Sequence, residues 1–337
     1  MKNKLIYWLI WLSVLILLIL CVSIFSLCVG SADISFRKIF SLNLAKSHST
    51  AYTIIFNIRL PRIILGFAIG GALSLAGVIL QGMFRNPLVE PYTLGISGGA
   101  ALGVCLNAIL GLNSTFGILS IPIFGFSGAV LVIIFVYFLS LKKGVLRIQG
   151  LLLTGVMISF IASSLIMFLM AISGIEDLHG IIFWIMGSLE EPNWMLIKLI
   201  LILSICGLVI SYFFCFDLNA LSLGEEEALH LGVNVERTKK SLFLLASLLT
   251  GFSVSVAGII GFIGLVVPHF MRMFVGQDHR ILLISSFLAG ASFLIFSDTI
   301  ARTIILPLEL PVGVITGIVG GSLFIYVLAK KEFIFWR

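Results

Sequence analysis

The run LIYWLIWLSVLILLILCVSIFSLCV at residues 5–29 contains no charged side chain. It is longer than the roughly 20 apolar residues that a helix needs to cross the hydrocarbon core of a bilayer. Lys2 and Lys4 precede it as they would in a signal peptide, but the run exceeds the usual apolar region of about 7–15 residues and has no A-x-A cleavage site. We therefore expect it to be retained as the first membrane-spanning helix.

The composition of the whole chain agrees with a membrane protein. Of its 337 residues, 60% are hydrophobic and 11% are charged, against roughly 45–50% and about 25% in soluble domains. A soluble fold needs more polar surface than this, so soluble enzymes and nucleic-acid-binding proteins are excluded. The five cysteines lie in apolar stretches, are odd in number and show no CxxC spacing, which indicates neither a disulfide framework nor a zinc site.

Ten apolar segments are candidates for membrane spans. They predict an all-α polytopic membrane protein with about ten transmembrane helices, which form a single domain over residues 1–337. A shorter apolar piece at residues 180–189 is expected to form a re-entrant or surface helix. The predicted spans cover residues 5–29, 61–83, 92–112, 117–141, 148–171, 193–216, 240–257, 260–275, 281–300 and 311–329.

The basic residues favour one orientation. With the N-terminus inside, 14 of the 21 Lys and Arg residues fall on the inner side, and an even number of spans then places both termini in the cytoplasm. The inner residues are Lys2, Lys4, Arg85, Lys142, Lys143, Arg147, Arg237, Lys239, Lys240, Arg272, Arg280, Lys330, Lys331 and Arg337; the others are Arg37, Lys38, Lys46, Arg59, Arg62, Lys198 and Arg302.

Two patterns of small residues indicate how the helices pack. The motif G-x-x-x-S-x-A-G-x-I at residues 70–79 recurs at 251–260, and the same shift of 181 carries Pro87 onto Pro268 and Gly95 onto Gly276. Because spans 2 and 7 run in opposite directions, this predicts an inverted repeat of spans 2–5 and 7–10, which is typical of transporters. Glycines at every fourth position in 95–103 and 313–321 allow close helix packing, within one subunit or between two.

The most charged segment, residues 217–240, falls on the expected cytoplasmic side. Glu225–Glu227 favour the start of a short helix, Gly232 can end it, and Asn234 can cap the next helix. At 24 residues the loop is longer than most connections. A docking element is therefore favoured over a solvated connector.

Two outer segments carry arginines. In Arg59-Leu60-Pro61-Arg62, Pro61 suits the first turn of a helix, whereas Arg62 would oppose the helix dipole there. Contact with a partner and snorkelling to the headgroups are the two alternatives. Arg302 can pair with Asp298 at i,i+4, and an exposed pair of this kind contributes about 0.3–0.5 kcal/mol.

Catalytic motifs are weak or absent. Gly95-Ile96-Ser97-Gly98 matches the GxSG of rhomboid proteases, but the surroundings of His269 do not match the histidine motif that such a serine needs, so Ser97 is better explained by packing. The sequence has no Gly-Lys dipeptide and therefore no Walker A motif. We expect no catalytic residue, no metal site and no cofactor bound by this chain.

Four segments together resemble the FecCD permeases, which are membrane subunits of ABC importers for ferric siderophores, haem and vitamin B12. The likeness covers nearly the whole chain. Its segments are RLPR at 59–62, GMFRNPLVEPYTLG at 82–95, GIIGFIGLVVPH at 258–269 and ELPVG at 309–313.

The resemblance implies an assembly in a prokaryotic cytoplasmic (inner) membrane. A second permease subunit, two ABC ATPases that use ATP, and an extracytoplasmic substrate-binding protein would be the partners. Docking of the binding protein is implied for Arg59, Arg62 and Arg302, and a cytoplasmic gate for Asn86, Leu88, Ile148 and Gln149. Coupling to the ATPase is implied for Leu223, Gly224, Glu225, Glu226, Glu227, Ala228, Leu231 and Gly232.

The function expected from these observations is import of an iron chelate, foremost a ferric siderophore, with haem or vitamin B12 as other cargoes. An ion-coupled secondary transporter is an alternative, although it normally needs ionisable groups deep in the spans, and Lys198 is the only plain one. An intramembrane serine protease is a second alternative and depends on Ser97 alone.

Overall fold

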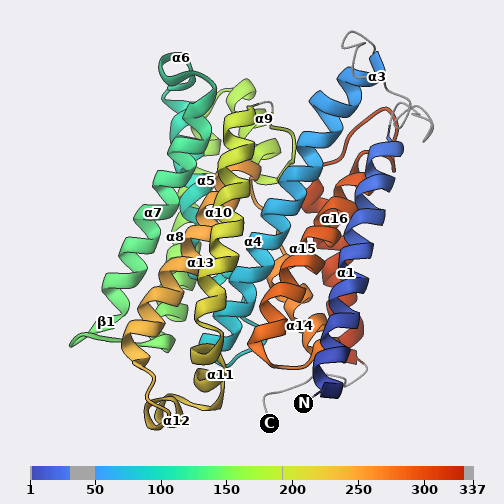
Figure 1. Ribbon diagram of the computed structural model, residues 1–337. Helices are drawn as coiled ribbons and strands as arrows, with labels where there is room; N and C mark the ends of the chain where they lie inside the picture. The colour runs from blue at the N-terminus through green and yellow to red at the C-terminus, as the bar shows by residue number, and fades with distance from the viewer. Residues whose placement is uncertain (1, 31–49, 192, 330–337) are drawn as a thin grey trace.

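The computed structural model describes residues 2–30, 50–191 and 193–329, and most of these residues are helical. The central element is α4 (Leu60–Phe84), which is buried along nearly its whole length. It packs against α10 (Trp194–Phe213), α13 (Val235–Ala257), α14 (Ile263–Val275) and α15 (His279–Ala301). Figure 1 shows α4 running through the middle of the bundle. Helices on its rim expose large apolar side chains, as expected of a surface that faces lipid.

Seven helices in the described residues are long and apolar enough to cross a membrane. They confirm predicted spans 1, 2, 4, 5, 6, 7 and 9. In addition to the helices already named, they include α1 (Lys2–Cys28), α7 (Ser120–Ser140) and α8 (Ile148–Ile172).

Predicted spans 3, 8 and 10 form shorter apolar helices, so the count of ten is not confirmed. α5 (Ile96–Ile109) and α14 have 14 and 13 residues, or roughly 20 Å at about 1.5 Å per residue. Both begin late because Gly95 (φ 78°) and Phe262 (φ 69°) take left-handed backbone conformations directly before them. The tenth segment forms α16 (Val312–Ala329).

The second span does not begin at Pro61, contrary to the sequence prediction. α3 (Thr50–Thr53) and a π-helical turn, η1 (Ile54–Arg59), lead into α4 without a break. A wider π turn relieves the clash that a proline ring makes inside an α-helix. Arg62 therefore lies outside a first helical turn, and the dipole argument for a partner at this residue does not hold.

Short elements connect the long helices. An antiparallel hairpin of β1 (Leu141–Lys142) and β2 (Val145–Leu146), not predicted from the sequence, joins α7 to α8. Lys143 and Gly144 both have positive φ in its turn, as two-residue hairpins of type I′ require. The surface helix expected at residues 180–189 is α9 (Ile175–Ile185), which is displaced toward the N-terminus. The remaining elements are η2 (Pro91–Leu94), α6 (Asn113–Phe116), η3 (Gly117–Leu119), α11 (Cys215–Leu223) and α12 (Glu225–His230).

The start of α1 and the charged loop lie at the same end of the bundle. Lys4 pairs with Asp278 at 3.3 Å, and Asp278 accepts a hydrogen bond from Asn219 of α11. In Figure 1 this end carries α11, α12 and β1, while α3, α6 and α9 lie at the other end. We call these the inner and outer ends, following the predicted orientation. Six of the basic residues used for that prediction, Arg37, Lys38, Lys46, Lys330, Lys331 and Arg337, lie outside the described residues.

The repeated motif occupies α4 and the end of α13, but the fixed shift of 181 does not continue beyond these helices. Gly95 precedes α5, whereas Gly276 follows α14, because the connection before α14 is shorter. α4 packs on α14 and α15, and α13 packs on α5 and α7, as two related halves would. The inverted repeat stays a prediction.

Candidate functional site

A hollow of about 440 Å³ at the inner end brings together residues that the resemblance assigned to two different tasks. The gate candidates Asn86, Ile148 and Gln149 line it, and so does Glu225 of the coupling segment. Leu88, the fourth gate candidate, is 48% exposed and donates its backbone N–H to Asn86 Oδ1 at 2.9 Å. The gate and coupling candidates are therefore neighbours in space, although the sequence separates them widely.

The coupling segment contains one short helix, α12, where it was predicted, and then leads into α13, which is a continuous helix of 23 residues and not a second short one. α12 begins at Glu225 and ends before Gly232, which has φ 84°. Asn234 then accepts a hydrogen bond from the backbone N–H of Arg237 and caps α13. Leu223, Leu229 and Leu231 are 60–64% exposed on this charged element. Apolar side chains that gather on a polar loop indicate a contact surface.

α12 is anchored to the membrane helices by a buried lysine. Lys239 of α13 is 1% exposed, and its Nζ lies 3.0 Å from Glu225 Oε2 and 2.7 Å from Glu236 Oε1. The same Nζ donates to the carbonyl oxygen of Leu146 at 3.1 Å, and the Leu146 N–H donates to Glu236 Oε2 at 2.8 Å. We call Glu225, Glu236 and Lys239 the inner ionic cluster. It ties α12, α13 and the hairpin together.

The three predicted docking arginines lie at the outer end, but all are buried, with exposed fractions of 2–6%. Arg59 donates to the carbonyl oxygens of Leu27 and Cys28 at 2.6 and 3.0 Å. The predicted Asp298–Arg302 pair is present at 2.9 Å, but it is buried and not exposed as expected. Its environment differs because α1 and α4 cover this end of α15.

Arg62 connects segments that are far apart in the sequence. Its guanidinium lies 2.7 Å from Glu309, 3.4 Å from Glu190 and 3.7 Å from Asp298. We call these four residues and Arg302 the outer ionic cluster. Arg62, Glu190, Asp298 and Glu309 line a hollow of about 450 Å³. The side chains of Glu190 and Glu309 are 76% and 40% exposed, so the accessible charge at this hollow is mainly negative.

The connection after α4 (residues 85–95) and the connection before α14 (residues 258–262) are hydrogen-bonded to each other inside the bundle. Glu90 Oε1 accepts the N–H of Phe262 at 2.7 Å, and the Tyr92 hydroxyl accepts the N–H of Ile260 and donates to its carbonyl oxygen, at 3.1 and 3.0 Å. These bonds satisfy backbone groups that a helix break would leave unpaired in an apolar environment. In the sequence, Pro87 and Pro91 were the signal for this irregular segment.

The structure gives no support to the protease alternative. α5, which carries Ser97, packs on α7 and α8, while α14, which carries His269, packs on α4 and α15. The neighbours of Ser97 have a packing role: a Cβ at Gly99 would meet the side chain of Val132 and the carbonyl oxygen of Gly128 on α7. The glycine stripe at residues 95–103 thus serves packing within the subunit.

The expectation that Lys198 is the only plain charge within the spans is wrong. Lys198 is exposed in the first turns of α10, whereas Arg62, Asp298 and Arg272 are buried among helices. Arg272 of α14 donates to Gln81 of α4. The sequence named these residues but did not indicate that they are buried, because they lie near the predicted ends of the spans.

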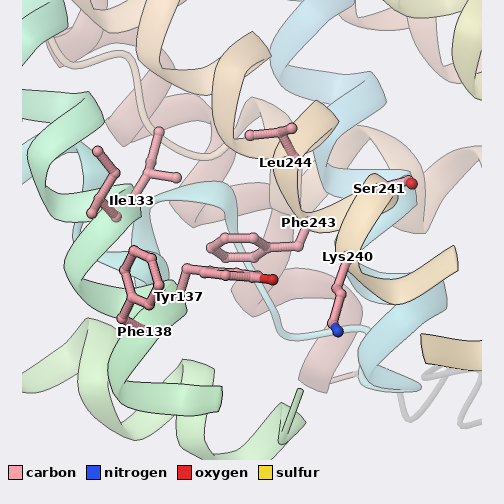
Figure 2. Close-up of a pocket in the computed structure, with 8 residues that line it drawn as sticks. Ile133, Tyr137, Phe138, Lys240, Ser241, Phe243 and Leu244 are labelled. Atoms are coloured by element: carbon pink, nitrogen blue, oxygen red, sulfur yellow. The ribbon is translucent and has the colours of Figure 1, made fainter. Parts of the chain in front are cut away.

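An apolar groove of about 320 Å³ lies between α7 and α13 near the inner end. Figure 2 shows the rings of Tyr137 and Phe243 lying over one another in it, with Lys240 at its edge. The ring centroids are 6.2 Å apart. Lys240 donates to the carbonyl oxygen of Gly144 at 3.0 Å, so neighbouring lysines of α13 have different surroundings.

Comparison with known proteins identifies relatives along nearly the whole chain. The FecCD transport family model matches residues 16–330. The chain is 38% identical over 325 residues to the hemin transport system permease protein HmuU of Yersinia pestis, covering 95% of this chain and 96% of the relative. It is 40% identical over 283 residues to the cobalamin import system permease protein BtuC of Halobacterium salinarum, covering 84% and 75% of the two chains.

The fold also matches a solved structure. That structure is described as a metal-chelate type ABC transporter in an inward-facing conformation, and it superposes with a TM-score of 0.85. The two chains are 32% identical, and the match covers 95% of this chain and 98% of the other.

Proposed function

This chain belongs to the FecCD transport family, and we propose that it is the permease subunit of a binding-protein-dependent ABC importer that carries an iron chelate into the cytoplasm. The observation that carries this proposal is α12, a short helix with exposed leucines that is tied by Lys239 to the hollow lined by the gate candidates. A chain that hydrolyses ATP itself would not need such a projecting element. Catalysis is assigned to ABC ATPase subunits that seat on α12.

The proposed coupling surface is Leu223–Ala228 together with Leu231 and Gly232. Leu223 and Leu231 are the apolar contacts, and Glu226 and Glu227 are exposed beside them. Ala228 is fully buried and fixes the helix against the permease. Aliphatic contacts with a charged rim resemble the core and rim of other protein interfaces.

The proposed gate is the inner hollow, with Asn86, Leu88, Ile148 and Gln149 as the moving groups. Its support is that the two segments carrying these residues, the turn after α4 and the start of α8, converge there. A second permease subunit would contribute the matching half, whether the pair is a homodimer or a heterodimer.

The proposed orientation places α12 and both termini in the cytoplasm of a prokaryote, at the inner membrane. Single cysteines at Glu226 and Thr115 test it, in a variant that lacks the five native cysteines. An impermeant thiol reagent should label Thr115→Cys in intact cells and Glu226→Cys only after permeabilisation. Labelling of Glu226→Cys from outside would contradict the coupling assignment.

A ferric siderophore is proposed as the cargo. Its support is that relatives 38–40% identical to this chain are named for hemin, ferric dicitrate, a siderophore and cobalamin, so that iron compounds predominate among the named cargoes. Uptake of radiolabelled iron as ferric siderophores, of hemin and of cobalamin should be compared in cells that lack the permease and in cells that carry it. Restored uptake of a ferric siderophore is expected. Restored uptake of hemin or cobalamin alone would replace the cargo but keep the transport class.

A further inference from the structure

The inner ionic cluster joins three segments that lie apart in the sequence. Glu225 opens the coupling helix α12, and Glu236 lies in the first turn of α13. Leu146 ends the hairpin two residues before α8 begins at Ile148. Lys239 Nζ contacts all three, at 3.0, 2.7 and 3.1 Å. We call residues 147–149, which include the gate candidates Ile148 and Gln149, the gate turn. The ammonium group of Lys239 therefore bonds to the coupling helix through Glu225 and to the residue before the gate turn, Leu146.

The burial of Lys239 makes this contact unusual. Its side chain is 2% exposed, whereas the two carboxylates are 40% and 33% exposed. A buried ammonium is costly unless charged or polar groups surround it. Its three partners use the three donors that an ammonium group has. A displacement of α12 away from the hairpin would leave this charge without one of them.

Each partner is also fixed to its own segment. Glu236 holds the Leu146 N–H at 2.8 Å, so the hairpin is attached to α13 by two bonds of opposite direction. The Arg147 N–H donates to the carbonyl oxygen of Ser140 at the end of α7, which closes the hairpin directly before the gate candidates Ile148 and Gln149. Glu225 stands in the first turn of α12, the helix proposed to seat on the ATPase.

We propose that Lys239 is the positioning residue that joins the coupling helix to the gate turn, so that the two move as one body during transport. The inference rests on the proposed function and adds to it the residue that transmits the motion. A push on α12 reaches residues 147–149 through Glu225, Lys239 and Leu146. Transmission along the polypeptide chain alone would have to pass back through α11, α10, α9 and the whole of α8.

The test uses the full permease assembled with its ATPase and binding protein in liposomes, and measures cargo imported per ATP hydrolysed. Lys239→Met keeps the length of the side chain and removes its charge. We expect the ratio to fall at least tenfold while the ATPase remains bound. Lys240→Met is the matched control, because this neighbouring lysine lies at the groove of Figure 2 and donates to the Gly144 carbonyl oxygen. Its ratio should stay within twofold of the wild type.

A second variant keeps the test informative if Lys239→Met does not insert. Glu225→Gln changes a side chain that is 40% exposed, so the fold should tolerate it, and it removes only the ion pair to α12. Spin labels at His230→Cys and Lys143→Cys, in a variant without the native cysteines, then report the distance between α12 and the hairpin. We expect a broader distance distribution and a several-fold lower ratio in Glu225→Gln.

The outcomes separate the two proposals. A wild-type permease that neither binds nor stimulates an ATPase would overturn the proposed function itself. A wild-type permease that couples normally, together with Lys239→Met or Glu225→Gln variants that retain the full ratio and a narrow distance distribution, would overturn only the role of Lys239.

Discussion

Arg62 Nη2 lies 2.7 Å from Glu309 Oε2, which joins the outer part of α4 to the loop that precedes α16. The same guanidinium is within 4 Å of Glu190 and Asp298. Docking residues that project freely would be exposed, whereas Arg62 is buried and paired within the permease. The outer ionic cluster first of all holds four segments of the permease together, and a binding protein would have to compete with its internal pairs.

This arrangement predicts that Arg62 and Glu309 contribute unequally to stability. Arg62→Met takes away one of the two arginines that pair with the buried Asp298 and leaves it with Arg302, and breaking a buried pair by removing one member costs about 3–5 kcal/mol. Glu309 is 40% exposed, so Glu309→Gln should cost less than about 1 kcal/mol. Thermal unfolding in detergent measures both. Equal losses would show that the burial of Arg62 does not matter for stability.

Docking at the outer end makes a separate prediction. Arg59→Glu and Arg62→Glu should weaken capture of the binding protein, and a matching Glu→Arg change on the binding protein should restore part of the loss, which misfolding could not explain. Lys198→Glu, on an exposed side chain, is the control for a general charge effect. Affinity measured in lipid at low salt should fall most for Arg62→Glu. Unchanged affinity in both arginine variants would leave these residues a structural role only.

The coupling helix should be sensitive to proline. Ala228 is fully buried, and its N–H donates to the Gly224 carbonyl oxygen at 3.0 Å. Ala228→Pro removes this bond and costs about 3 kcal/mol or more in a helix of six residues. The permease should still insert, while ATP hydrolysis no longer drives uptake. Normal transport by Ala228→Pro with the ATPase bound would refute the coupling assignment.

Asp278 predicts a dependence of stability on pH. Hydrogen bonds from the Arg280 side chain at 3.0 and 2.6 Å, joined by bonds from Asn219 and Lys4, hold the pKa of this carboxyl well below its usual range, although partial burial opposes them. A lowered pKa in the folded state adds stability that is fully present above the unfolded value of about 3.9 and is lost as the pH falls through the folded value.

Asp278→Asn should therefore be less stable than the wild type at pH 7, by about 1 kcal/mol, because asparagine can still cap α15 but loses the ion pairs with Arg280 and Lys4. The difference should stay constant down to about pH 5 and shrink below about pH 4. Thermal unfolding over this range measures it. A difference that grows as the pH falls would contradict the direction of the pKa shift.

The sequence predicted local structure well where the signal is local. The caps at Gly232 and Asn234, the start of α12 at Glu225, and the apolar runs of the seven long helices all follow from neighbouring residues. Each depends on propensity, capping or a continuous apolar stretch, which are properties of one segment.

The predictions that failed concern features that depend on contacts between distant segments of the chain. The burial of Lys239 follows from a hairpin almost a hundred residues earlier, and the burial of Arg62 follows from Glu190 and Glu309. The late start of α14 follows from Phe262, whose left-handed backbone is held by Glu90 from another segment. Spacing within one segment carries no information about such partners, so neither the sequence pattern nor the resemblance predicted that these side chains are buried and paired.

The central claim is that ATP, hydrolysed on partner chains, drives import through this chain. The most direct measurement is uptake of a ferric siderophore into liposomes that hold the permease with its ATPase, with the binding protein outside. Uptake should require ATP at the α12 side, should require the binding protein, and should persist when ionophores remove all ion gradients. Uptake by the permease without an ATPase, driven by an ion gradient and abolished by the ionophores, would contradict the claim.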